Sequence, residues 1–180
     1  MSRFYFLVWS RWVVRVVLCS GMLSAFFSVF VTFVLYGLKG FPSLDENVIK
    51  ALVDIFLFWF PITLSFTLLV ALFRSLKYVF SKCLNGYEFV LFECNQTKQI
   101  QNVGYGDLVK VWRKWFVLLV WFVMGQVLVV SGLFFTFVND VFSWFNIYWL
   151  VGFILSGGYV SFMLLPSRVK VVKIRKCQRI

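Results

Sequence analysis

The chain has 180 residues, of which 62 % are hydrophobic and 14 % are charged, and its mean hydropathy is +0.89. A soluble domain of this length could not bury so much apolar surface, so the composition excludes a soluble globular protein. Histidine, the commonest general base and a frequent metal ligand, is absent. The formal charge of +11 is not accompanied by a nucleic-acid-binding motif. We therefore expect a membrane protein without catalytic residues, cofactor, metal site or nucleic-acid partner.

Four apolar runs are long enough to cross a hydrocarbon core, which takes about 20 helical residues. They cover residues 16–38, 55–73, 115–138 and 141–165. Asn139 and Asp140 alone separate the last two runs, which predicts an antiparallel hairpin. The expected fold is all-α: a four-helix transmembrane bundle that forms a single membrane domain over residues 1–180.

The segments that flank the first two runs also carry local signals. Tyr5, Trp9 and Trp12 precede the first run and are suited to the headgroup layer of a membrane. Ser43 and Glu46 have the spacing of a capping box, which predicts that the second helix begins at Ser43.

The basic residues predict the orientation of the bundle, because loops rich in Lys and Arg stay in the cytoplasm. Three precede the first run, seven lie in the loop 74–114 and six lie in the tail 166–180, so these regions hold 16 of the 18. Both termini and the loop are therefore expected to be cytoplasmic. The absence of a long outer loop favours a bacterial inner membrane.

The inner loop is the only sizeable region outside the apolar runs. Its segment YEFVLFE (residues 87–93) alternates like a short strand, and LVKVW (residues 108–112) is the expected partner in a small hairpin. The four cysteines (Cys19, Cys83, Cys94 and Cys177) do not form a C-x-x-C pair, so we expect four separate thiols.

Small residues recur at helical spacing within the runs, where they allow helices to approach closely. The candidate helix-contact residues are Ser20, Ser24 and Ser28 in the first run and Gly152 and Ser156 in the fourth. They fit packing inside the bundle or docking of another membrane protein, and the sequence does not separate these alternatives. Gln126 lies within the third run and is expected to face the bundle.

The string VGYGD (residues 103–107) resembles the selectivity filter of potassium channels, in which backbone carbonyls replace the hydration shell of the ion. That resemblance marks Gly104, Tyr105 and Gly106 as candidate loop residues. A polar segment precedes them where a pore helix should stand, basic residues follow, and the charge distribution places them inside. A tight turn is the alternative interpretation, with both glycines supplying unusual dihedrals.

A second resemblance rests on three segments in chain order. They are FPSL (residues 41–44), VDIFLFWFPITLSF (residues 53–66), and LLP (residues 164–166) followed by a basic tail. This arrangement resembles the immunity proteins that protect a bacterium against its own pore-forming colicin. The resemblance implies four spans, both ends inside, and contact with the toxin's pore helices within the membrane. Shorter outer loops and a longer inner loop distinguish this chain.

In size, span count and basicity, the chain is also similar to the inner-membrane exclusion proteins of conjugative plasmids, which block incoming DNA transfer. Both resemblances imply a small non-enzymatic membrane protein that blocks an incoming macromolecule through helix contacts. Its expected partners are the lipid bilayer and another membrane protein or a membrane-inserting toxin, with a second copy of the chain as an alternative. An ion-channel-like pore subunit and a structural subunit of a larger membrane complex are the other hypotheses.

Overall fold

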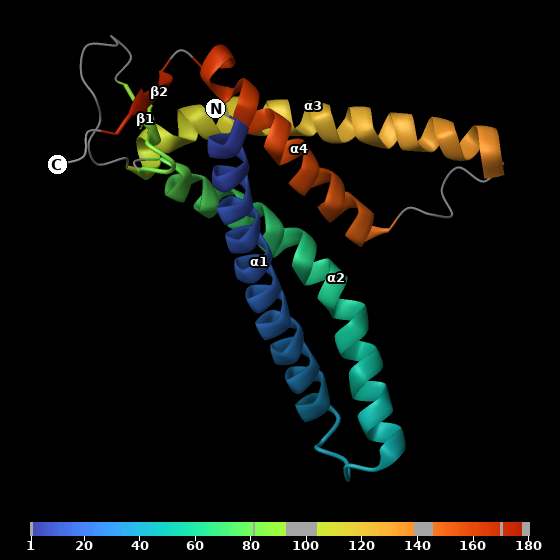
Figure 1. Ribbon diagram of the computed structural model, residues 1–180. Helices are drawn as coiled ribbons and strands as arrows, with labels where there is room; N and C mark the ends of the chain where they lie inside the picture. Colours follow the sequence, from blue (N-terminus) through green and yellow to red (C-terminus); the bar gives the residue numbers. More distant parts are fainter. Residues whose placement is uncertain (1, 81, 93–103, 139–145, 170, 178–180) are drawn as a thin grey trace. The chain divides into compact units, whose positions relative to one another are not determined.

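The computed structural model describes residues 2–80, 82–92, 104–138, 146–169 and 171–177. Its elements, in chain order, are α1 (Ser2–Leu38), α2 (Glu46–Leu76), the 3₁₀ turn η1 (Lys77–Val79), β1 (Tyr87–Leu91), α3 (Tyr105–Val138), α4 (Ile147–Arg168) and β2 (Val172–Lys176) (Figure 1). Among the described residues, four helices are long and apolar enough to cross a membrane. The prediction of a mainly helical chain with four such helices is therefore confirmed. Its placement in a membrane and the side of its termini stay predictions.

The chain divides into two compact units. The hairpin unit is Val14–Arg74, and the sheet unit combines Met1–Val13 with Ser75–Ile180. The helix α1 contributes its first turns to the sheet unit and the rest to the hairpin unit. The single membrane domain expected over residues 1–180 stays a prediction.

The hairpin unit consists of α1 and α2, which run antiparallel and are joined by a short loop (Figure 1). In this loop, Phe41 takes a positive φ of 52° directly after Gly40 at 77°. The α2 helix begins at Glu46, three residues later than predicted. The Ser43 hydroxyl lies 3.3 Å from the Asp45 carboxylate, and the Ile49 amide donates to the Asp45 carbonyl at 3.0 Å. Asp45 therefore takes the N-cap place, and the predicted capping box is wrong.

The sheet unit has an aromatic core that begins with the first turns of α1. Phe4 and Trp12 are each only 1 % exposed. The ring centroid of Phe4 lies 5.1 Å from that of Phe89 in β1. The Trp9 indole N–H donates to the Leu155 carbonyl of α4 at 2.7 Å. Trp12 is therefore buried and Trp9 is partly buried against α4, because the helix starts at Ser2 and carries both into contact with α4. The expected place of Tyr5, Trp9 and Trp12 in a headgroup layer stays a prediction.

A two-stranded antiparallel sheet completes this unit. The predicted strand is present as β1, but its partner is β2 in the basic tail, with Phe89 opposite Ile174. The segment 108–112 that was expected to pair with it lies in α3. Cys83 and Cys177 form a disulfide with their Cα atoms 5.9 Å apart. The expectation of four separate thiols is therefore wrong, since pairing of the tail with β1 brings these two distant cysteines together.

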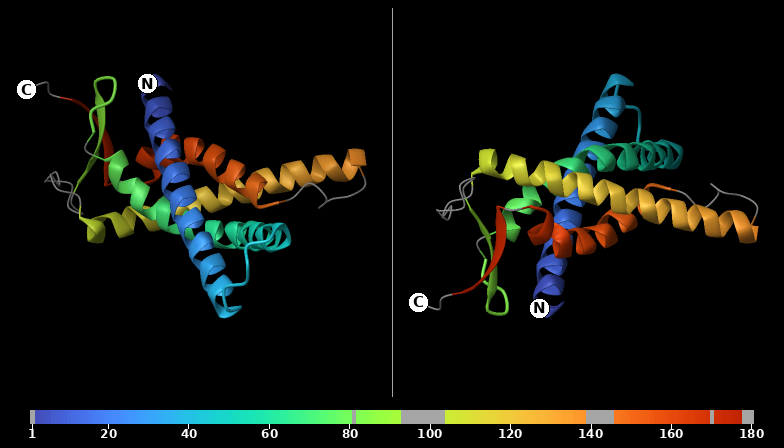
Figure 2. Two further views of the ribbon diagram at one scale, coloured as in Figure 1. Left: turned by 90° about the horizontal axis from the view of Figure 1, so that it is seen from below. Right: turned by 90° about the horizontal axis from the view of Figure 1, so that it is seen from above.

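The α3 and α4 helices pack against each other in the sheet unit. Asn146 caps α4, where its side chain accepts hydrogen bonds from the amides of Tyr148 and Trp149. In both views of Figure 2, the C-terminal end of α3 extends well beyond the N-terminal end of α4. The Asn139–Asp140 connection lies outside the described residues.

Candidate functional site

The small residues of α1 are used within the hairpin unit. Ser24 and Ser28 are 0 % exposed, and their hydroxyls lie 2.9 Å and 2.8 Å from the Thr63 hydroxyl of α2. Thr67 donates to the Ser20 carbonyl at 3.2 Å. In a membrane helix such groups must find partners inside the protein. The structure thus brings Ser20, Ser24 and Ser28 together in a closed contact between α1 and α2, where no further helix can reach them.

Two glycines of α4 are likewise enclosed, in the sheet unit. A Cβ atom at Gly158 would lie 2.6 Å from the Trp12 ring, and one at Gly157 would lie 3.2 Å from the Gln126 amide nitrogen. The Trp12 ring packs edge-on against the stacked rings of Trp115 and Phe162, with the Trp12 and Phe162 centroids 5.3 Å apart. Absence of a side chain at Gly158 is what lets α1 approach α4.

Gly152 and Ser156 lie on a different face of α4. Both are exposed, and a Cβ atom at Gly152 would meet nothing within 4 Å. The Ser156 hydroxyl donates to the side-chain carbonyl of Gln126 at 2.7 Å. The Gln126 amide group lies 3.5 Å from the Phe153 carbonyl. Gln126 therefore faces α4, and this polar pair marks the seam between α3 and α4.

Beside this seam is an open hollow of about 470 Å³. It is lined mainly by α3, including Gly125 and Gln126, and on α4 by Phe153. Gly125 and Gly132 are both exposed, with nothing within 4 Å of an added Cβ atom. Seven residues make almost two helical turns, so both glycines lie on one face of α3. We call Gly125 and Gly132 the open glycine face.

The α3 helix is also the least covered of the four. Only 6 % of its most apolar stretch is buried, against 22 % to 28 % for the other three helices. The residues of α3 that contact α1 or α4 include a stripe along one face, which we call the contact stripe: Trp115, Leu119, Phe122 and Gln126. At 100° per residue, the open glycine face lies next to this stripe on one side and Val120 and Val127 lie on the other. The α3 helix thus offers small residues that the chain itself leaves uncovered.

The described residues of the filter-like string, 104–107, lead into a helix. Tyr105 begins α3, with Gly106 and Asp107 in its first turn. The Leu108 amide donates to the Gly104 carbonyl at 3.2 Å, as in a helix, and neither glycine has a positive φ. In a helix the carbonyls point along the axis and are bonded to amides, whereas those of a filter face the ion. Asn102 and Val103 lie outside the described residues.

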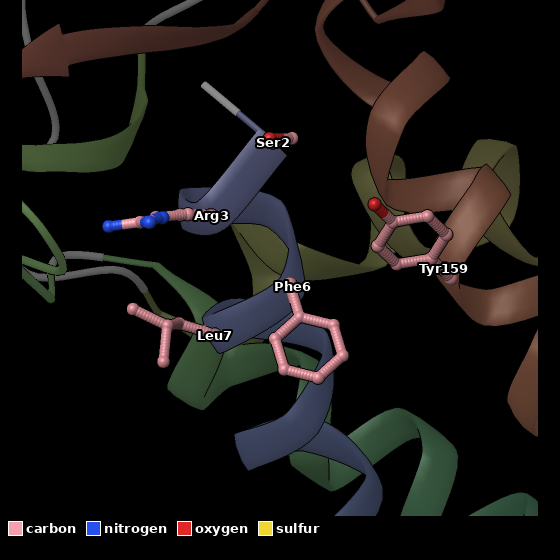
Figure 3. Close-up of a pocket in the computed structure, with 5 residues that line it drawn as sticks. All are labelled: Ser2, Arg3, Phe6, Leu7 and Tyr159. Atoms are coloured by element: carbon pink, nitrogen blue, oxygen red, sulfur yellow. The ribbon is translucent and has the colours of Figure 1, made fainter.

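A second hollow, of about 380 Å³, lies between the first two turns of α1 and the middle of α4. It is lined by Ser2, Arg3, Phe6, Leu7 and Tyr159. Figure 3 shows the Phe6 and Tyr159 rings facing each other across it, while Arg3 points away. Without a charged group directed into it, this hollow offers no specific binding chemistry. Among the described residues, no cluster of three His, Cys, Asp or Glu side chains could hold a metal ion.

The sequence reasoning missed the packing role of Gly157 and Gly158 and the openness around Gly125. The adjacent glycines were a signal for a close helix contact, but nothing in the sequence indicated that Trp12 is the residue they receive. For Gly125 and Gly132, the spacing of seven residues was visible, whereas their exposure depends on how far α4 extends along α3.

The four long apolar helices found among the described residues are compatible with a multi-pass membrane protein, in which some small residues are enclosed and others are open. Comparison with protein-family models, with curated proteins and with solved structures found no match to this chain.

Proposed function

We propose that the protein is a non-enzymatic membrane protein that acts inside the bilayer, by contact between its open glycine face and a helix of another membrane component. The observation that carries this proposal is the exposure of Gly125 and Gly132 on the least covered helix, beside the hollow at Gln126. Helices associate in lipid mainly through close packing, and small residues permit it. A helix surface that contacts only lipid chains does not need small residues for close packing.

The specific role we propose is to block an incoming macromolecule, as in immunity to a pore-forming colicin or exclusion in conjugation. Support comes from the resemblance of residues 53–66 and 164–166 and the basic tail to the immunity proteins. A membrane-inserted toxin presents helices to its target within the bilayer, which matches a receptive helix face. The partner is then a toxin helix or a helix of the mating apparatus.

A challenge assay tests this role. Bacteria that produce the chain from a plasmid are exposed to a panel of pore-forming colicins and, separately, used as recipients in mating with several conjugative plasmids. We expect strong protection against one toxin or one plasmid, and none for a strain carrying the empty vector. Full sensitivity across both panels, with the protein present in the membrane, would contradict the proposed role.

For localisation, we propose the bacterial inner membrane with both termini in the cytoplasm, supported by the distribution of 16 of the 18 basic residues. This places Cys83 and Cys177 in a reducing compartment, where disulfides are rare. Acid quenching of growing cells followed by alkylation with a mass-tagged maleimide measures the state of both thiols. We expect them to be reduced in cells and to pair on oxidation. A bond already complete in quenched cells would favour the opposite orientation.

The filter-based pore subunit is not favoured by any observation, because residues 104–107 lead into α3 and its first turn. A structural subunit of a larger complex would use the same glycine face and differs only in its partner.

A further inference from the structure

We propose that a second site, at the end of the α3–α4 pair, binds the phosphate headgroup of an anionic phospholipid. The site is a hollow of about 360 Å³ lined by Arg113, Lys114, Val117 and Leu118 of α3 and by Arg168 of α4. Its volume falls in the range of about 300–1,000 Å³ that is typical of ligand pockets. The proposal is independent of the helix-contact function.

The charge of this hollow favours an anion. Three exposed cationic residues from two helices line it, and in the described part of the chain none of them has an ion-pair or hydrogen-bond partner. Like charges repel when they are brought together, and a bound phosphate relieves that repulsion through charge-assisted hydrogen bonds. Arg168 ends α4, where a cation is favourable by itself. The informative feature is therefore that Arg168 lines the same hollow as Arg113 and Lys114.

The position of the cations identifies the anion as a lipid. Arg113 and Lys114 come directly before the apolar run of α3, and Arg168 follows that of α4. One helical turn further along α3, Val117 and Leu118 line the same hollow, and Val117 is 50 % exposed. A phospholipid has this pattern of anionic head and apolar chain, and basic pockets between helices at the membrane surface bind anionic headgroups. A free phosphate ion would gain nothing from the apolar part.

Native mass spectrometry of the purified full-length protein tests the proposal. Phosphatidylglycerol and phosphatidylcholine with identical acyl chains are the probes. We expect a retained phosphatidylglycerol molecule, and about 25-fold weaker retention for R113Q/R168Q, since each surface cation contributes about a factor of five. The control K39Q/K50Q also removes two exposed positive charges but lies outside the hollow, and should retain the lipid. R113K/R168K, which keeps the charge, should retain most binding.

Three results would overturn the proposal. Equal losses in R113Q/R168Q and K39Q/K50Q would show that only diffuse positive charge attracts the lipid. Equal retention of phosphatidylcholine by the unsubstituted chain would show that the site does not recognise the headgroup charge. Displacement of the bound lipid by excess inorganic phosphate would assign the hollow to free phosphate. Because the three cations are exposed and lack partners among the described residues, their substitution should leave the circular dichroism spectrum unchanged.

Discussion

The hairpin unit and the sheet unit are stabilised by different chemistry. In the hairpin unit, Ser and Thr hydroxyls bridge α1 and α2 and are satisfied within the contact, as between Ser24 and Thr63. In the sheet unit, Trp12 packs on Gly158 among other rings, and a disulfide joins the tail to the segment before β1. Small residues are thus enclosed in both units, and both units also leave some open, at Gly21 in the hairpin unit and at Gly125, Gly132 and Gly152 in the sheet unit. The spacing of small residues in the sequence does not indicate whether they are already enclosed in a contact between helices of the same chain.

The largest expected difference between the units is covalent. The Cys83–Cys177 bond spans 94 residues of chain. Closing so long a loop lowers the conformational entropy of the unfolded state, which stabilises the folded protein by about 4 kcal/mol. We expect C83S to lower the free energy of unfolding of the oxidised protein by about that amount, measured by titration with SDS in mixed micelles. C19S, which removes the cysteine that is free in the described part of the chain, is the control and should have little effect.

Enlarging a side chain in the contact between α1 and α2 should lower the stability of the protein almost as much. Ser24 is completely buried, so Ser24→Leu must separate α1 from α2 and removes the bond to Thr63, at a cost of about 3 kcal/mol. Phe27→Leu, at a position 44 % exposed on the same helix, should change stability by less than about 0.5 kcal/mol. The same SDS titration measures both. Equal tolerance would mean that α1 and α2 do not meet at Ser24.

Two glycines of α4 give a matched pair with opposite expectations. Gly158→Ala places a methyl group against the buried Trp12 ring and should destabilise the protein by about 2 kcal/mol. Gly152→Ala meets no neighbour and should be neutral or stabilising by up to about 1 kcal/mol, because alanine favours helices. Thermal unfolding in detergent compares them. A loss of stability at Gly152 equal to that at Gly158 would remove the distinction between open and closed glycines.

The smallest effect concerns the polar pair at the seam. A double-mutant cycle with Gln126→Leu and Ser156→Ala isolates their hydrogen bond, and we expect a coupling free energy of about 0.6 kcal/mol, typical of such bonds between membrane helices. Unfolding in SDS provides the four free energies. Strict additivity would indicate that Gln126 and Ser156 are not bonded in the membrane.

Much of the fold was predictable because long apolar runs leave little alternative to helices. The strand at residues 87–91 also followed from its alternation, and its predicted partner failed because LVKVW has the apolar spacing of a strand but continues directly into the apolar run of α3. Pairing of β1 with a strand of the tail, and with it the disulfide, depends on contacts across more than 80 residues that local pattern does not encode. For the same reason, Ser24 and Gly152 both matched a small-residue pattern, although only Ser24 is enclosed.

The central claim is that the open glycine face of α3 is where the partner helix binds. The most direct measurement compares protection in the challenge assay for G125L/G132L and for V120F/V127F. The second variant adds bulk at the same spacing on the other side of the contact stripe of α3. Immunoblots and SDS titration must show equal amounts and stability of both proteins in the membrane. We predict that G125L/G132L loses protection while V120F/V127F keeps it. Full protection by G125L/G132L, or equal loss in both variants, would contradict the claim.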